Sequence, residues 1–208
     1  MNKQTASSIF KLLLIATITY GLYLSIFKPL SVENGLLPAI AYFTIQSNIL
    51  LVMALIFFLF AGHQNRVTAI VRGGVIIYIL ITGLVFHFLL VPGLPEYFAD
   101  GLSFRHHITH TIAPIGFILD WLLFDIKGMM RNSDLKYWII YPLLYWIVTI
   151  SYGIIRGLYP YFFMDVGAIG FAAVITWFFA LTAFIIILSF LVVRLDNMSI
   201  FKPKNGES

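Results

Sequence analysis

Six stretches of this 208-residue chain are each long enough and apolar enough to cross a lipid bilayer as a helix. A bilayer core needs about 20 mostly apolar residues for each helical crossing. With 61% of the residues hydrophobic, 11% charged and a mean hydropathy of +0.95, the composition is that of an integral membrane protein. The sequence therefore predicts an all-α, polytopic membrane protein, a six-transmembrane-helix bundle with spans at about 9–29, 36–61, 70–92, 106–125, 136–156 and 168–194.

The chain outside these spans is too short for a separate soluble domain, so residues 1–208 are predicted to form a single transmembrane domain. Long uninterrupted apolar runs differ from the short alternating segments of a transmembrane β-barrel. The N-terminal apolar run, preceded by Lys3, resembles a signal peptide, but no small-residue cleavage site follows it. We therefore expect this run to be retained as the first helix. The absence of cysteine excludes disulfides, thiolate nucleophiles and iron–sulfur ligation.

Basic residues are divided unevenly between the two sides of the predicted bundle. An even number of spans places both termini on one side, and that side carries ten lysines and arginines against three at Lys28, Arg105 and Arg156 on the other. Because cytoplasmic loops carry the excess of basic residues, we expect both termini in the cytoplasm. The pI of about 9.3 then reflects membrane orientation, and no nucleic-acid partner is expected.

Polar side chains inside the spans are concentrated in the second to fifth helices. Such groups are costly in a bilayer, so they usually face the bundle interior and often mark function. Most are expected in the outer half of the membrane, with Thr44 about 12 Å and His110 about 6 Å into their helices. Because a continuous ion pathway would need polar side chains through to the other face of the membrane, this one-sided layer of polar residues argues against one. Its candidate members are Thr44, Gln46, Ser47, Asn48, His87, His106, His107, His110, Tyr152 and Arg156.

The fourth span carries the densest polar pattern, "HHITHTIAPIGFILD". His106 and His110 are four residues apart and share a helix face, as Thr44 and Asn48 do in the second span. Pro114 cannot donate a backbone hydrogen bond to the carbonyl of His110, which predicts a kink there. Asp120 lies about 15 Å further along the helix, too far to orient His110. We expect it to pair with a cation such as Arg72 or Lys11.

A hydroxyl and an imidazole at similar depth on different helices can perform acyl transfer. Histidine removes the proton of an otherwise weak threonine nucleophile, and an ester or amide is cleaved through an acyl-enzyme. Asn48, Gln46 or Tyr152 are candidate oxyanion donors or orienting groups. The alternative, structural interpretation is that Thr44 bonds its own helix carbonyl four residues back and that the histidines serve packing or the membrane interface.

Three segments carry a resemblance to a known family: "YFTIQSNILL", "HHITHTIAPIGFILDWLLFD" and "YPLLYWIVTISYGIIRGLYPYFFMD". They resemble bacterial six-span relatives of the androgen-induced membrane hydrolases of animals, which cleave fatty-acid esters of hydroxy fatty acids with an intramembrane threonine. The resemblance implies Thr44 as nucleophile, His110 as catalytic histidine, a membrane lipid or fatty-acyl ester as substrate, no cofactor, and a bacterial plasma membrane. The "QSN" after Thr44, the paired His106 and His107, and the histidine-to-proline spacing depart from the animal pattern, which leaves the substrate open.

Two other functions remain open from the sequence. His106 and His110, with His107 or His87, have the spacing to ligate a metal or haem, although no second helix carries a matching pair. A small transporter is the other alternative, although no inverted repeat or pair of broken helices is visible. The sequence does not define the oligomeric state.

Overall fold

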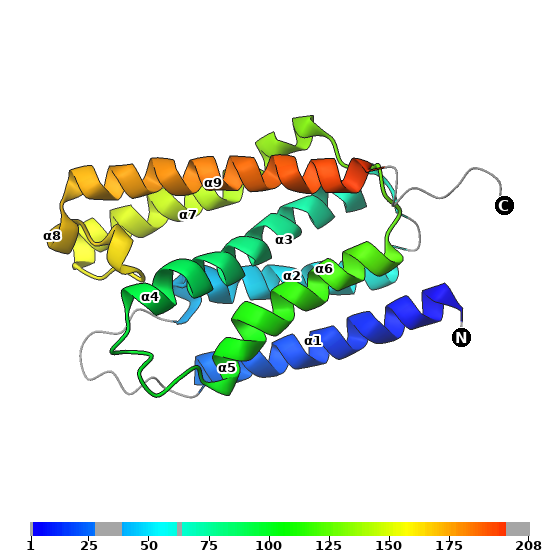
Figure 1. The fold of residues 1–208 in the computed structure, drawn as a ribbon, viewed down its shortest axis with the longest axis horizontal. Helices are drawn as coiled ribbons and strands as arrows, with labels where there is room; N and C mark the ends of the chain where they lie inside the picture. Colours follow the sequence, from blue (N-terminus) through cyan, green and yellow to red (C-terminus); the bar gives the residue numbers. More distant parts are fainter. Residues whose placement is uncertain (1, 28–38, 62–63, 199–208) are drawn as a thin grey trace.

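The structure is a computed structural model that describes residues 2–27, 39–61 and 64–198. Within these residues, six helices are long and apolar enough to cross a membrane, running over Lys3–Phe27, Phe43–Phe60, Arg66–Gly93, Phe104–Phe124, Asn132–Arg156 and Phe171–Asn197. They lie side by side as a bundle in which α1 begins and α9 ends at the same end (Figure 1). The predicted all-α, multi-pass membrane architecture is confirmed.

Several spans are built from more than one helical segment. The first, second and sixth spans are single segments, namely α1 (Lys3–Phe27), α2 (Phe43–Phe60), which follows the 3₁₀ turn η1 (Ala39–Ala41), and α9 (Phe171–Asn197). The third and fourth spans each contain a π turn, and short helical turns flank the last two. These segments are α3 (Arg66–Val85), η2 (Phe86–Leu90), α4 (Val91–Gly93), α5 (Phe104–His107), η3 (Ile108–Ile112), α6 (Ala113–Phe124), η4 (Asn132–Asp134), α7 (Leu135–Arg156), η5 (Phe162–Met164) and α8 (Val166–Ile169).

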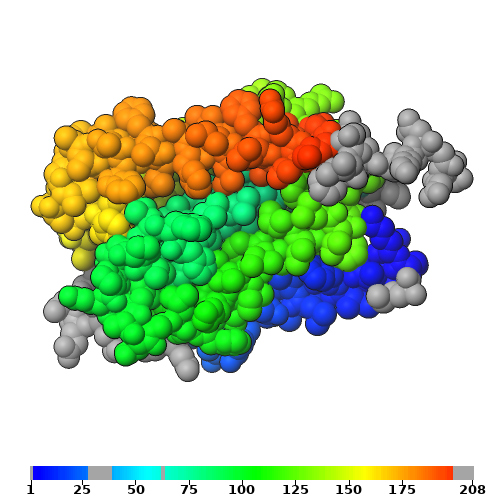
Figure 2. Space-filling view, in the orientation of Figure 1, coloured from blue at the N-terminus to red at the C-terminus, as the bar shows by residue number. Residues whose placement is uncertain are grey.

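The third span is the centre of the bundle. Helix α3 packs against α2, α6, α7 and α9, and its Ile76, Ile77 and Ile79 are fully buried. By contrast, α9 buries only 17% of its most apolar window and covers one side of the molecule in the space-filling view (Figure 2). Exposed phenylalanine and leucine side chains on such a helix are suited to contact with lipid.

The second helix begins later than its hydropathy predicts. The expected start of this helix near residue 36 is wrong, because among the described residues the α-helix begins only at Phe43. It follows η1 and Tyr42, whose backbone angles are extended (φ −81°, ψ 131°). The expected depth of Thr44 is therefore also wrong, because Thr44 lies in the first turn of α2 rather than eight residues into it. Hydropathy does not detect this break, because the residues on both sides of it are apolar. Pro38, predicted in the first turn, lies outside the described residues.

Other helix boundaries differ for local reasons. Helix α1 begins at Lys3 rather than near residue 9, since its polar first turns continue the helix beyond the apolar run. Gly170 has φ +79°, a conformation that favours glycine, and it separates α8 from α9. Lys28, Lys202 and Lys204, which enter the charge count above, lie outside the described residues.

Asp120 is paired at the end of the bundle where α1 begins. Its carboxylate is fully buried and accepts from Lys11 Nζ at 2.8 Å and Arg72 Nη1 at 2.7 Å. Arg72 also binds Asp125 through Nε at 2.7 Å. Pairing of Asp120 with Arg72 or Lys11, expected from the sequence, is confirmed for both cations. Between Asp120 and His110, the buried residues Ala113 and Phe117 of α6 form apolar core.

Candidate active site

Thr44 and His110 meet at the end of the bundle opposite to Asp120. Thr44 Oγ1, in the first turn of α2, lies 3.2 Å from His110 Nε2, in the π turn η3. His110 is buried, with 7% of its surface exposed, while Thr44 is partly exposed. The structure thus brings together the two residues for which the sequence suggested a joint role.

The other ring nitrogen of His110 is fixed by groups that can accept a proton. Nδ1 lies 3.2 Å from the carbonyl oxygen of His106 and 2.9 Å from Thr109 Oγ1. A carbonyl only accepts, and the Thr109 hydroxyl donates to the carbonyl of Arg105 at 2.9 Å. Nδ1 therefore carries the proton, and the unprotonated Nε2 accepts from the Thr44 hydroxyl. This is the tautomer that a general base requires.

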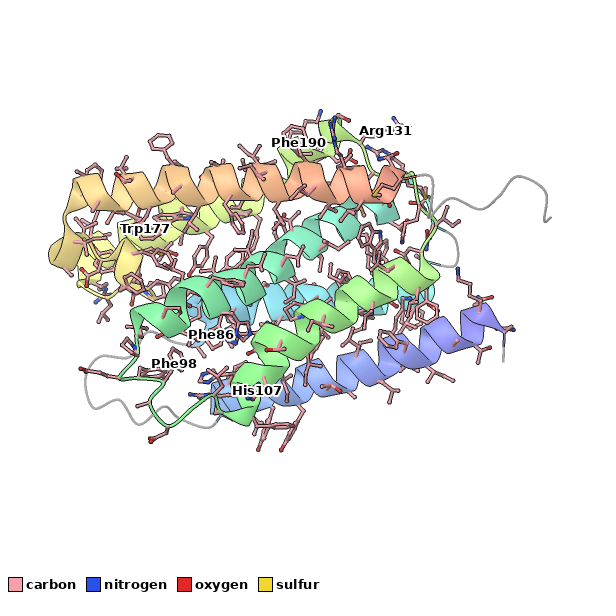
Figure 3. All side chains as sticks on the ribbon, viewed as in Figure 1. Phe86, Phe98, His107, Arg131, Trp177 and Phe190 are labelled. Carbon is pink, nitrogen blue, oxygen red and sulfur yellow. The ribbon has the colours of Figure 1, made fainter. Side chains whose placement is uncertain are left out.

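The His110 ring is also held from the neighbouring span. Phe86, 3% exposed, stacks on it with ring centroids 3.7 Å apart and planes 20° from parallel. Phe86 opens the π turn η2, so the two π turns in the described part of the chain contact one another at this point. Such turns occur frequently at functional sites. Figure 3 shows Phe86, Phe98 and His107 grouped where α4 and α5 approach each other.

Asn48 ties the threonine helix to the histidine helix. Its Nδ2 donates to the carbonyl of Thr44 at 2.8 Å and to the carbonyl of Thr109 at 3.2 Å. Asn48 is fully buried, and its Oδ1 has no partner among the described atoms. Ser47 makes a second link, 2.7 Å from Thr82 of α3. Both residues therefore fix the position of the first turn of α2 and do not point their donors at a substrate.

Two tyrosines surround the start of α2. Tyr145 of α7 donates its O–H to the carbonyl of Ala41 at 2.9 Å and accepts from the amide of Phe43 at 3.2 Å. Tyr161, in the loop between α7 and η5, lies against Thr44. Burial raises the pKa of the Tyr161 phenol, and the side chains of Tyr161 and Thr44 line one apolar cavity. Tyr161 was not singled out individually from the sequence, where the only signal was the aromatic "YPY".

A small apolar cavity of about 60 Å³ adjoins Thr44 between α3, α7 and α9. By comparison, a cavity of about 150 Å³ accommodates benzene. This cavity therefore holds a few carbon atoms. Besides Thr44 and Tyr161, its walls include Ile81, Leu181 and Ile185.

The remaining candidates form hydrogen bonds with other groups or are exposed. His87 Nε2 is 2.9 Å from Thr111, and His106 Nδ1 is 3.1 Å from Ser103. Gln46 is occupied by the Ile40 carbonyl at 2.8 Å and the Tyr141 hydroxyl at 2.7 Å. The exposed members of the predicted set are His107, Tyr152 and Arg156.

Within the described ranges, no group of three or more histidine or acidic side chains is arranged to hold a metal ion. Both ring nitrogens of His110 are engaged by protein groups, and its ring centroid is 5.9 Å from that of His106.

Comparison with protein-family models, curated proteins and solved structures finds no match for this chain. The chemistry of the site is therefore inferred from its own geometry.

Proposed function

We propose that this protein is an intramembrane hydrolase that cleaves a lipid fatty-acyl ester, with Thr44 as nucleophile and His110 as general base. The observation that carries the proposal is the 3.2 Å approach of Thr44 Oγ1 to His110 Nε2, together with the proton held on Nδ1 by the His106 carbonyl. A hydroxyl facing an unprotonated imidazole nitrogen is the arrangement that activates a weak nucleophile. The resemblance to the threonine hydrolases supports the same assignment.

The reaction follows from these positions. Thr44 Oγ1 attacks the ester carbonyl carbon while its proton passes to His110 Nε2. The tetrahedral intermediate collapses as Nε2 returns that proton to the leaving alcohol oxygen, which leaves the acyl group on Thr44. A water molecule, deprotonated by the same nitrogen, then attacks the acyl carbon, and Nε2 returns the proton to Thr44 Oγ1 as the fatty acid leaves.

The start of α2 supplies stabilisation for the developing oxyanion. Thr44 is in the first turn, where backbone amides lack intrahelical acceptors and the helix dipole is positive. In this turn the amides of Phe43, Ile45 and Gln46 already donate to Tyr145 or Tyr42, which leaves the Thr44 amide, and the Tyr161 phenol lines the same cavity as Thr44. We assign these two groups to the oxyanion hole.

The cavity beside Thr44 suits the first carbons of an acyl chain. Because its volume of about 60 Å³ accommodates only a few carbons, a longer chain must extend between the helices toward the lipid. An ester that diffuses in the bilayer reaches the site by this route without leaving the membrane.

The distribution of charge supports both termini on the cytoplasmic side of the membrane, and the family resemblance favours a bacterial plasma membrane. Among the described residues, the end at which α1 begins carries eight lysines and arginines, whereas the end with Thr44 carries only Arg105 and Arg156. By the positive-inside rule, the Thr44 end is then the outer one. The catalytic pair accordingly lies in the outer half of the membrane.

The test measures hydrolysis of short-chain aryl esters by the purified protein in detergent. Thr44→Ala should abolish turnover, and His110→Ala should reduce it by about 10²- to 10⁴-fold because the general base is lost. Thr17→Ala is the matched control, since the exposed Thr17 hydroxyl only donates to the carbonyl of Leu13. His107→Ala, at an exposed histidine, controls for loss of an imidazole. Unchanged hydrolysis by Thr44→Ala would exclude the proposed nucleophile.

A further inference from the structure

A second cavity, of about 420 Å³, lies at the end of the bundle opposite to Thr44. It is a cleft formed by the start of α1, the end of α2, the start of α3, the end of α6 and the loop that follows α6. Its volume is about seven times that of the cavity at Thr44. The proposed ester hydrolysis does not use it.

The acidic groups around the cleft already have partners. Asp120 accepts from Lys11 and Arg72, and both oxygens of Asp125 are bound by Arg72 at 2.7 and 3.0 Å. Asp196 accepts two backbone amides through one oxygen, at 2.8 and 3.0 Å. The carboxylates therefore complete the protein's own network and are poorly placed to bind a cation.

Several donors at the cleft have unused hydrogen-bonding capacity. Lys3, on the first turn of α1, is exposed at the cleft and has no acidic partner within 4.0 Å among the described residues. The indole N–H of Trp121, whose side chain also contributes to the lining, has no hydrogen-bond partner in the described part of the chain. Lys11 uses two of its three N–H bonds, on Ser7 at 2.5 Å and on Asp120. A donor-rich cleft is suited to a ligand that offers mainly acceptors.

The long-range charge at this end is positive as well. The end carries eight lysines and arginines, including Arg131 (Figure 3), against four aspartates in the described ranges. An anion is accordingly attracted to it. The cleft walls also include apolar side chains, namely Phe58, Leu59, Phe124, Ile126, Met129 and Met130.

We propose that this cleft binds a phosphate monoester carried on an alkyl chain, with the phosphate at Lys3, Lys11 and Trp121 and the chain along Phe58 and Phe124. A phosphate monoester offers several charged acceptor oxygens, which match the unused donors. The apolar walls favour a lipid phosphate over a free phosphate. At the level of the headgroups, such a lipid reaches the cleft from the membrane leaflet.

The test compares ligands with the same chain and different headgroups. The purified full-length protein in a neutral detergent is titrated with lysophosphatidic acid, with lysophosphatidylcholine of the same chain and with inorganic phosphate, and binding is followed by thermal stabilisation. We expect saturable stabilisation by lysophosphatidic acid and little by lysophosphatidylcholine. Equal stabilisation by both lysolipids would overturn the proposal. An equal response to inorganic phosphate would overturn the assignment to a lipid and leave a soluble phosphate ester as the ligand.

Variants separate the cleft from general surface charge. Lys3→Gln and Trp121→Phe should each weaken lysophosphatidic acid binding by about tenfold, as expected for the loss of one hydrogen bond to a charged group. Lys136→Gln is the matched control, because Lys136 is exposed at the same end and does not line the cleft. If Lys136→Gln weakens binding as much as Lys3→Gln does, the attraction is unspecific and the proposed site is wrong.

Discussion

Replacement of Gly83 by alanine tests whether the packing of α3 against the fourth span holds His110 in place. A Cβ atom at position 83 would lie 2.9 Å from the carbonyl oxygen of His110 and 3.1 Å from Cγ of Pro114. Ordinary contacts begin at 3.4 Å, so the two helices must separate by about half an ångström. A backbone carbonyl and a proline ring cannot move aside as a flexible side chain does.

The expected effects follow from this displacement. Overpacking lowers the free energy of unfolding by about 1–3 kcal/mol. Alanine in place of glycine inside a helix raises it by about 1 kcal/mol. The net loss of stability of Gly83→Ala is therefore about 0–2 kcal/mol. A misplacement of about 1 Å at a catalytic group reduces the rate about 10²-fold. Half that displacement at His110 should slow the reaction of Thr44 with a fluorophosphonate probe by about tenfold.

Gly74→Ala provides the matched control on the same helix. Its Cβ would meet Trp138 Cδ1 at 3.2 Å and the Tyr78 hydroxyl at 3.5 Å, contacts that are less tight than those at Gly83 and lie about 14 Å from it along the helix. This variant should be about as stable as the wild type and should react with the probe at the wild-type rate. The assay combines thermal unfolding in detergent with the time course of labelling. If Gly83→Ala behaves like Gly74→Ala in both measurements, the close approach of α3 does not position His110.

Two further predictions concern the charged groups at the end where α1 begins. Asp120→Asn leaves Lys11 and Arg72 without their shared buried carboxylate, so the free energy of unfolding in mixed micelles should fall by about 3–5 kcal/mol; a loss below 1 kcal/mol would contradict the importance of this pairing. Burial lowers the pKa of Lys127 to about 8 from its ordinary value of 10.5. Between these two pH values the unfolded chain binds more protons than the folded one, so the folded state becomes more stable as the pH rises. The Tm should therefore increase when the pH is raised from about 8 to 10.5. Lys127→Gln should remove this part of the pH dependence, and an unchanged slope would show that other groups cause it.

Much of the fold could be predicted because hydropathy measures the dominant constraint on a membrane chain. The six spans and the pairing of Asp120 follow from the high free energy of exposing polar groups to lipid. The start of α2 could not be predicted, because the extended residue Tyr42 lies between apolar residues on both sides. This boundary matters for function, since it places Thr44 and its backbone amide in the first turn of a helix.

The candidate site was predictable in part. Thr44 and His110 were suggested by their chemistry and by a family resemblance, and their facing orientation depends on the packing of two separate spans. The stacking of Phe86 on His110 arises from the contact between two π turns, which leaves no periodic signal in the sequence. The approach of Tyr161 to Thr44 depends on how the loop after α7 folds back over α2.

The most direct test of the central claim is peptide mass spectrometry that locates the adduct after reaction with a fluorophosphonate. We expect an adduct on the peptide that contains Thr44, at its hydroxyl, and a much slower reaction in His110→Ala. His107→Ala, which removes an exposed imidazole from the same helix, should react as the wild type does. An adduct on a different residue, or modification of Thr44 at the same rate without His110, would contradict the proposed threonine–histidine pair.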